Sequence, residues 1–228
     1  VFGFLNKSFV TAYVTLAFIL CLTPLASLLS NLINYPIEEY IRRWYINDAK
    51  KILSGMKSLD IVGITGSYGK TSMKFYLGEL LNSQYNTLIT PESYNTPMGV
   101  VKTIRMMMKS THEIFVCEMG ARHVGDIKEL CDIVNPHDAI ITSIGPQHLE
   151  TFGKIENIIS TKFELGDAVN GKGKILVNGD DENIRKGMGK YENVITYGFS
   201  DNNDYRAKDI SVSYKGTKFT VVSKSGEE

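Results

Sequence analysis

The hydrophobic and polar positions divide the chain into two parts with different patterns. Residues 8–33 read SFVTAYVTLAFILCLTPLASLLSNLI, and no charged residue occurs between Lys7 and Glu38. As a helix this run would be roughly 39 Å long, more than the ~30 Å hydrocarbon layer of a bilayer. We therefore expect a transmembrane segment over residues 1–34. A buried core helix or a signal peptide would give a similar pattern, and Pro24 leaves a kinked, re-entrant or hairpin element open.

The segment that follows the apolar run has the composition of a membrane border. It contains four aromatic residues typical of a membrane interface: Tyr35, Tyr40, Trp44 and Tyr45. It also contains four basic residues, against the single Lys7 on the other flank: Arg42, Arg43, Lys50 and Lys51. The positive-inside rule then places residues from 38 onward in the cytoplasm. We expect a juxtamembrane helix or linker over residues 35–59.

From residue 60 to about 200, strand-like and helix-like patterns alternate. Strand patterns fall at 60–65, 113–120, 138–145, 174–180 and 193–199, and helical patterns near 70–84, 97–109, 125–134, 155–170 and 181–190. Such alternation predicts an α/β fold with a mostly parallel sheet and helices on both faces. Residues 205–222 differ, because they read as a β-hairpin that turns at Lys215 and Gly216.

Composition narrows the classes of partner. The chain has 228 residues and a formal net charge of zero, so nothing argues for nucleic acid as a partner. Its three cysteines, Cys21, Cys117 and Cys131, form no C-x-x-C pair. Neither a zinc ribbon nor a disulfide framework is indicated.

A glycine-rich loop joins the first predicted strand to the first predicted helix of the α/β part. It reads GSYGKTS, and its candidate nucleotide-binding residues are Gly66, Ser67, Gly69, Lys70, Thr71 and Ser72. Glycine tolerates positive φ, so backbone N–H groups can curl around phosphates at the helix N-terminus. Lys70 can reach the terminal phosphates of ATP, and the Thr71 hydroxyl can bind Mg²⁺. The first glycine of the common G-x-x-x-x-G-K-[ST] pattern is replaced by Ile64, and a glycine-rich turn that merely opens a helix is the alternative.

Polar residues stand where the predicted parallel strands end, which is where an open sheet binds ligands. They are Glu118, His148, Asn178, Asp180 and Asp181. Each could be an ordinary loop residue. Together with the loop they would form one crevice suited to Mg²⁺-assisted phosphoryl transfer.

Five motifs give the chain a more specific likeness. GITGSYGKTS, SYNTPMGV, CEMGARHVGDI, GPQHLETFGKIENIISTKFEL and ILVNGDDENI occur in this order. Their order and spacing resemble the Mur ligase family, over about residues 60–222. The resemblance implies that residues 60–228 are the central ATP-binding domain of that family, incomplete at its C-terminal end.

The resemblance also implies a reaction. In the family, ATP phosphorylates a substrate carboxylate, and an amine attacks the acyl phosphate to form an amide. The implied role is a ligase of peptidoglycan precursor synthesis that faces the cytoplasm from the membrane. Its partners would be ATP, a UDP-linked or lipid-linked muropeptide and an amino-acid or dipeptide amine.

The family pattern assigns roles to individual residues. Lys70 would serve the phosphates, and one Mg²⁺ would lie on Thr71 and Glu118. A second Mg²⁺ would lie on His148 and on Lys162, where many members carry a carbamylated lysine; a solvated helix lysine is the alternative.

Three further positions match family motifs. Asn95 would lie near the acyl-phosphate site, so the implied catalytic set is Lys70, Asn95, His148 and Lys162. Asn178 matches an adenine contact, with an ordinary Asx turn as the alternative. His123 matches a motif without an assigned role and could simply cap a helix.

Departures from the family keep other functions open. The usual uridine-nucleotide-binding N-terminal domain is replaced by the hydrophobic segment, and the C-terminal domain is not in the chain. The alternatives are a poly-γ-glutamate or folylpolyglutamate synthetase-like ligase and a non-catalytic ATP-binding membrane scaffold. Retention of Glu118, His148 and Lys162 together argues against the scaffold.

Overall fold

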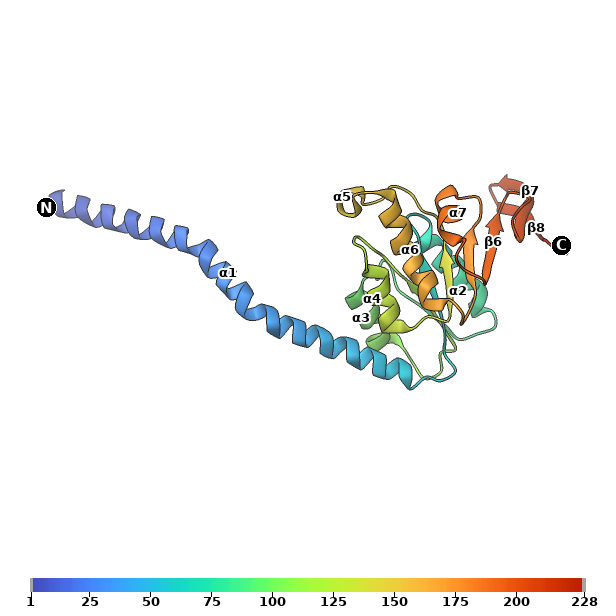
Figure 1. The fold of residues 1–228 in the computed structure, drawn as a ribbon. Coiled ribbons are helices and arrows are strands. Elements are labelled where there is room, and N and C mark those ends of the chain that lie inside the picture. Colours follow the sequence, from blue (N-terminus) through green and yellow to red (C-terminus); the bar gives the residue numbers. More distant parts are fainter. Residues whose placement is uncertain (1, 227–228) are drawn as a thin grey trace. The chain divides into compact units, whose positions relative to one another are not determined.

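The structure of the chain is a computed structural model that describes residues 2–226, and side chains from residue 9 onward (Figure 1). It contains two compact units, residues 1–45 and 46–228. The outermost residues of the predicted ranges 1–34 and 60–228 lie outside the described residues. So does the Lys7 side chain used in the orientation argument.

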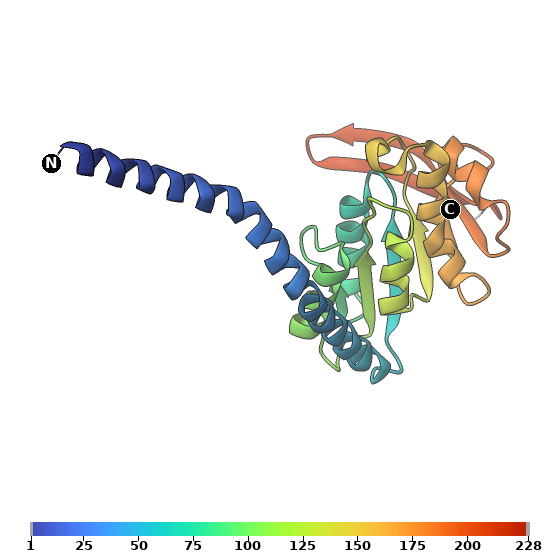
Figure 2. The same ribbon diagram turned by 60° about the vertical axis from the view of Figure 1, so that its left-hand side comes forward.

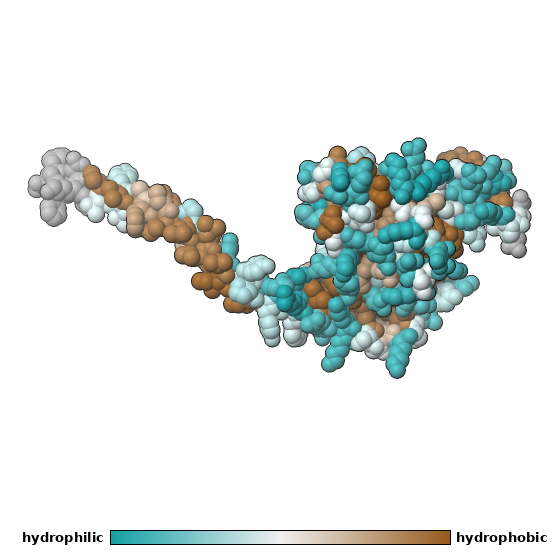
Figure 3. All heavy atoms as spheres, in the orientation of Figure 1, coloured by the Kyte–Doolittle hydropathy of each residue, from teal (hydrophilic) through white to brown (hydrophobic). Residues whose placement is uncertain are grey.

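The apolar run belongs to one long helix, α1 (Phe2–Ser54), which contains Pro24 and Pro36. The helix is not divided at either proline, although the sequence left a division at Pro24 open. Its large apolar side chains from Phe9 to Ile33 are exposed, and they line the visible face of this helix in Figure 3. Within the described residues, this is the one helix long and apolar enough to cross a membrane. Insertion in a membrane stays a prediction.

The second unit contains an eight-stranded sheet in the order β2-β3-β1-β4-β5-β6-β7-β8. The strands are β1 (Asp60–Thr65), β2 (Thr87–Ile89), β3 (Ile114–Glu118), β4 (Asp138–Ile141), β5 (Ile175–Asn178), β6 (Val194–Gly198), β7 (Tyr205–Ser213) and β8 (Gly216–Ser223). Every neighbouring pair is parallel except the hairpin β7–β8. The predicted mostly parallel sheet and terminal hairpin are confirmed, whereas the short strand β2 was not predicted.

Helices cover both faces of this sheet, as predicted (Figure 2). They are α2 (Lys70–Asn82), α3 (Pro97–Met107), α4 (Asp126–Val134), α5 (Leu149–Phe152), α6 (Ile155–Val169) and α7 (Glu182–Met188). On one face Ile64 belongs to a core cluster against which Leu77 of α2 packs. On the other face a Cβ at Gly63 would lie 2.6 Å from Leu165 of α6, so the glycine permits a close helix–sheet approach.

The register of the central strands positions the site. Ile64 of β1 pairs with Glu118, the last residue of β3, and Thr65 pairs with Ile141, the last residue of β4. The three strands therefore end at one edge of the sheet. The loops that follow them carry most of the residues singled out in the sequence.

Candidate functional site

The loop after β1 is anchored on the loop after β4. The Ser67 N–H donates to the Ser143 carbonyl at 2.7 Å, and the Thr142 hydroxyl donates to the Tyr68 carbonyl at 2.6 Å. Gly66 and Gly69 have φ of +149° and +80°, conformations that side chains rarely adopt. A Cβ at Gly66 would also collide with the Thr142 side chain. Both glycines are thus required by the loop geometry.

Lys70 begins α2 and folds back across this loop. Its ammonium donates to the Gly66 carbonyl at 2.8 Å and to the Ser67 carbonyl at 3.2 Å. Burial lowers the pKa of Lys70, and the Glu118 carboxylate opposes that shift. The loop therefore holds a positive charge beside the N-terminus of a helix, an arrangement that favours phosphate.

Glu118 connects three segments beneath the loop. Its Oε1 accepts from the Thr71 hydroxyl at 3.2 Å and from the Asn95 side-chain amide at 3.0 Å. Its Oε2 forms an ion pair of 2.9 Å with the Lys74 ammonium. Lys74 also donates to the Glu92 carbonyl at 2.5 Å, so it links Glu118 to the loop that carries Asn95.

A cavity of about 310 Å³ opens beside the loop. Its lining includes all four predicted catalytic residues, Lys70, Asn95, His148 and Lys162. The β3–α4 loop contributes Arg122 and His123. Thr71 and Glu118 lie next to it through their bonds with each other and with Asn95. The structure thus brings the predicted catalytic and metal-binding side chains to one place.

Lys162 lies on α6 with its side chain only 3% exposed. Burial first, and the Lys70 charge second, lower the pKa of Lys162 from 10.5 to about 8 against the opposing effects of Asp126 and Glu164. A solvated helix lysine, the alternative reading, does not describe this residue. A lowered pKa makes the neutral amine, which is the form that reacts with CO₂, more accessible near neutral pH.

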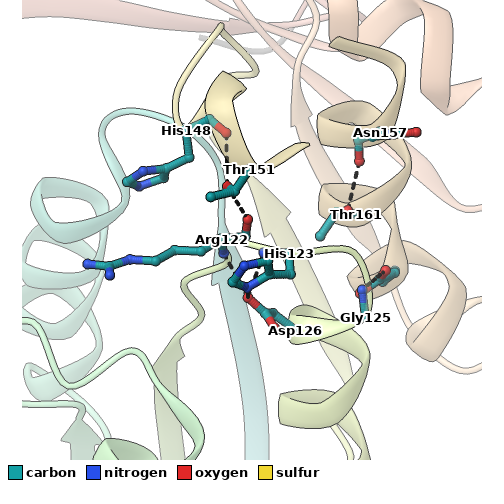
Figure 4. Close-up of polar contacts among 9 residues, drawn as sticks. Arg122, His123, Gly125, Asp126, His148, Thr151, Asn157 and Thr161 are labelled. Atoms are coloured by element: carbon teal, nitrogen blue, oxygen red, sulfur yellow. Dashed lines mark hydrogen bonds and ion pairs between the residues drawn. The ribbon is translucent and has the colours of Figure 1, made fainter. Parts of the chain in front are cut away.

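His148 and the β3–α4 loop face one another across the cavity (Figure 4). His148 has φ of +56°, and its carbonyl accepts from the Thr151 hydroxyl at 3.0 Å. The same hydroxyl donates to the Arg122 carbonyl at 2.5 Å. Asp126 accepts from the Arg122 and His123 N–H groups at 2.7 and 2.8 Å, so the start of α4 fixes the loop as well.

For three residues singled out in the sequence, the described part of the structure gives no contact that supports a role in the site. Asn178 ends β5, and its side-chain oxygen accepts from the Asp180 N–H at 3.1 Å, which is an Asx turn; its role with adenine stays a prediction. Ser72 is exposed in the first turn of α2. The His123 side chain makes no capping hydrogen bond, because the N-cap residue of α4 is Gly125. The His123 N–H donates to the Asp126 carboxylate at 2.8 Å, and the ring Nδ1 lies 3.8 Å from the same oxygen.

Two residues with clear places in the site were missed in the sequence. Lys74 is fully buried and pairs with Glu118. Its signal was its position four residues after Lys70, on the side of the helix that carries Gly78 inward. Arg122 stands within a quoted motif, but only the fold places it at the cavity.

The family resemblance implies Mg²⁺ at this site, and the side chains present fit one ion better than two. Thr71 and Glu118 offer two hard oxygen donors that meet within hydrogen-bond distance, and Mg²⁺ binds through few protein oxygens together with phosphates and water. They fit one ion. The described residues contain no group of three or more His, Cys, Asp or Glu side chains that could hold a metal. His148 with an unmodified Lys162 ammonium does not fit a second ion.

Comparisons with known proteins show which proteins this chain is similar to. A model of the Mur ligase middle domain matches residues 64–228. The UDP-N-acetylmuramoyl-tripeptide--D-alanyl-D-alanine ligase of Bacillus subtilis (strain 168) is 34% identical over 161 residues, which cover 71% of this chain and 35% of that ligase. The ligase of the same name from Escherichia coli (strain K12) is 29% identical over 169 residues, covering 73% and 37%.

Solved structures give the same relationship. MurF ligase from Thermotoga maritima in complex with ADP has a TM-score of 0.74 and 31% identity, over 81% of this chain and 43% of that chain. MurF from Acinetobacter baumannii has a TM-score of 0.69 and 27% identity, over 80% and 42%. The chain spans a little over a third of the length of the curated relatives described above.

Proposed function

The chain belongs to the Mur ligase family through the family's middle domain, and on that premise we propose that it is the ATP-binding core of an amide-forming ligase. The reaction would join a carboxylate to an amine in the synthesis of peptidoglycan precursors. One observation carries the proposal: Lys70, Asn95, His148 and Lys162 line one cavity beside a phosphate-binding loop. A scaffold without catalysis would not need this set.

The reaction proceeds in two steps that conserve atoms and charge. A carboxylate oxygen attacks the γ-phosphorus of ATP, the bond to ADP breaks, and an acyl phosphate forms. The amine nitrogen then attacks the acyl carbon, the carbon–oxygen bond breaks, and phosphate leaves while the nitrogen loses a proton. The carboxylate, the γ-phosphate and the tetrahedral intermediate are all anionic, so the Lys70 ammonium would stabilise charge where it develops.

In this proposal Asn95, Thr71 and Glu118 position the acyl group and the metal ion. Asn95 is held by Glu118 and by its own carbonyl, which accepts from the Gly120 N–H at 2.8 Å. Its amide is therefore held in a fixed position and would lie beside the acyl group in this proposal. Thr71 and Glu118 would hold Mg²⁺, which neutralises phosphate charge when bound.

We infer that Lys162 acts as a carbamate. Carbamylation replaces an ammonium by two oxygen donors, which with His148 would suit a second Mg²⁺. The burial of Lys162 and its lowered pKa support this modification. Lys162→Arg should then be inactive, because guanidinium keeps its charge and cannot be carbamylated in the same way.

The substrates follow from the relatives' names. We propose a UDP-N-acetylmuramoyl-tripeptide-like carboxylate, or a lipid-linked equivalent, and a D-alanyl-D-alanine-like amine. ATP is the nucleotide, and MurF with ADP in the same fold supports it. Asn178 remains our candidate for contact with adenine.

Location and domain division are part of the proposal. Residues 1–34 would span the membrane, residues 35–59 would border it, and the ligase part from residue 60 would face the cytoplasm, where ATP is. The exposed apolar side chains of α1 support this arrangement. Alkaline carbonate should leave the protein in the membrane fraction; release of all of it into the supernatant would refute the membrane location.

The test of the central assignment is Lys70→Ala in the intact protein. The variant should lose ATP-dependent phosphate release in the presence of UDP-N-acetylmuramoyl-tripeptide and D-alanyl-D-alanine, with its circular dichroism spectrum unchanged. Lys57→Ala is the matched control, because Lys57 is exposed and lies outside the cavity. Undiminished phosphate release by Lys70→Ala would overturn the assignment.

A further inference from the structure

Arg122 is a basic residue of the cavity to which the proposed mechanism assigns no role. Arg122 lies in the loop between β3 and α4 and forms part of the cavity wall. Figure 4 shows the side chain extending past the His148 ring, away from α4. Among the described residues, no hydrogen bond or ion pair involves this guanidinium.

The backbone that carries Arg122 is fixed from two sides. Its N–H donates to the Asp126 carboxylate at 2.7 Å, and its carbonyl accepts from the Thr151 hydroxyl of α5 at 2.5 Å. The same Asp126 oxygen accepts from the His123 N–H at 2.8 Å. A fixed backbone limits the positions that the guanidinium can reach, which reduces the cost of ordering it on a ligand.

The cationic guanidinium of Arg122 favours an anion beside it. Among the residues that line the cavity, Lys70 is also basic, Asp126 and Glu129 carry carboxylates, and Lys162 adds positive charge only while it is not carbamylated. The Asp126 oxygen nearest the loop is already occupied by two backbone N–H groups. The guanidinium is thus available to a ligand.

We propose that Arg122 binds a second carboxylate of the carboxyl-bearing substrate, distinct from the carboxylate that is phosphorylated. The reacting carboxylate must meet the γ-phosphate at Lys70, on the loop after β1. Arg122 comes from a different loop, after β3, so it holds another part of the same substrate. A guanidinium binds the two oxygens of a carboxylate with parallel hydrogen bonds, and a lysine in its place would not.

This inference rests on the proposed ligase function and adds a specificity determinant to it. The experiment compares the intact enzyme with Arg122→Met, Arg122→Lys and the control Lys128→Met, whose exposed ammonium pairs with Asp132 within α4. The probes are ATP, D-alanyl-D-alanine and two UDP-N-acetylmuramoyl-tripeptides that differ in whether the non-reacting carboxylate is free or amidated. Thermal denaturation checks that each variant is folded.

The expected result is a selective loss. Arg122→Met should raise the KM for the free-carboxylate tripeptide roughly 10- to 100-fold, the range of one charge-assisted bidentate contact, with the KM for ATP unchanged within about twofold. Arg122→Lys should fall between the parent and Arg122→Met. The amidated tripeptide should bind parent and Arg122→Met equally, and Lys128→Met should behave as the parent.

Calorimetric binding of both tripeptides without turnover separates this inference from the proposed function. Equal binding of the free-carboxylate tripeptide by the parent and by Arg122→Met would overturn the inference about Arg122. A rise in the KM for ATP alone would also overturn it, because that result would assign the guanidinium to the nucleotide. If the parent binds the tripeptide through Arg122 but forms no amide, the proposed reaction fails and the binding role stands. If the parent binds neither tripeptide, both fail.

Discussion

Replacement of Lys74 by methionine tests whether the Lys74 ammonium balances the buried charge of the Glu118 carboxylate. The Lys74 and Glu118 side chains are 0% and 1% exposed, and their charged atoms lie 2.9 Å apart. Methionine fills nearly the same volume, so the main effect is to leave the Glu118 carboxylate buried without its partner. Breaking a buried ion pair in this way costs about 3–5 kcal/mol of the free energy of unfolding. Lys74→Met also removes the hydrogen bond to the Glu92 carbonyl, which adds about 1 kcal/mol.

The assay is denaturant unfolding of the detergent-solubilised chain, followed by circular dichroism. The double variant Lys74→Met with Glu118→Gln should regain most of the loss, because a neutral buried pair replaces an unpaired charge. Lys128→Met, which breaks an exposed pair with Asp132, should cost less than about 1 kcal/mol. A loss below about 1 kcal/mol for Lys74→Met, or a double variant less stable than Lys74→Met, would refute the reasoning.

Two other predictions concern neighbouring positions. A Cβ at Gly120 would lie 2.7 Å from the Asn95 side-chain oxygen, so Gly120→Ala should displace Asn95. Amide formation should fall roughly 10- to 100-fold in steady-state kinetics, while a nucleotide titration shows unchanged binding. A normal rate of amide formation in this variant would contradict the prediction. In CO₂-free buffer, Lys162 has a folded pKa of about 8 against 10.5 when unfolded, so the unfolded chain binds more protons between those values and stability rises with pH. Relative to Lys162→Met, the free energy of unfolding should therefore increase by about 3 kcal/mol from pH 8 to 10.5, and equal pH profiles would contradict the shift.

Local patterns were sufficient for most of the fold. Apolar strand patterns and helical spacing located β1, β3, β4, β5 and β6 and the helices between them except α5. The three-residue strand β2 and the four-residue helix α5 were not predicted, because neither is long enough to show a periodic pattern of apolar residues. The continuity of α1 through two prolines also could not be read from the sequence, since a helix tolerates the loss of single hydrogen bonds.

Part of the site could be predicted from local sequence patterns, and part depends on tertiary contacts. The glycine loop and Lys70 are consecutive in sequence, so their chemistry was visible there. The contacts of Arg122 with Thr151, and of Lys74 with Glu118, join segments that are 29 and 44 positions apart. Such contacts depend on how the strands are ordered in the sheet, which no local pattern specifies.

The central claim is that this core activates a carboxylate by phosphorylation. The most direct measurement is oxygen transfer: UDP-N-acetylmuramoyl-tripeptide labelled with ¹⁸O in its reacting carboxylate is turned over with ATP and D-alanyl-D-alanine by the intact enzyme. An acyl phosphate loses its bridging oxygen with the phosphate, so the account predicts one ¹⁸O atom in each inorganic phosphate released. Phosphate without label, formed together with the amide product, would contradict the mechanism.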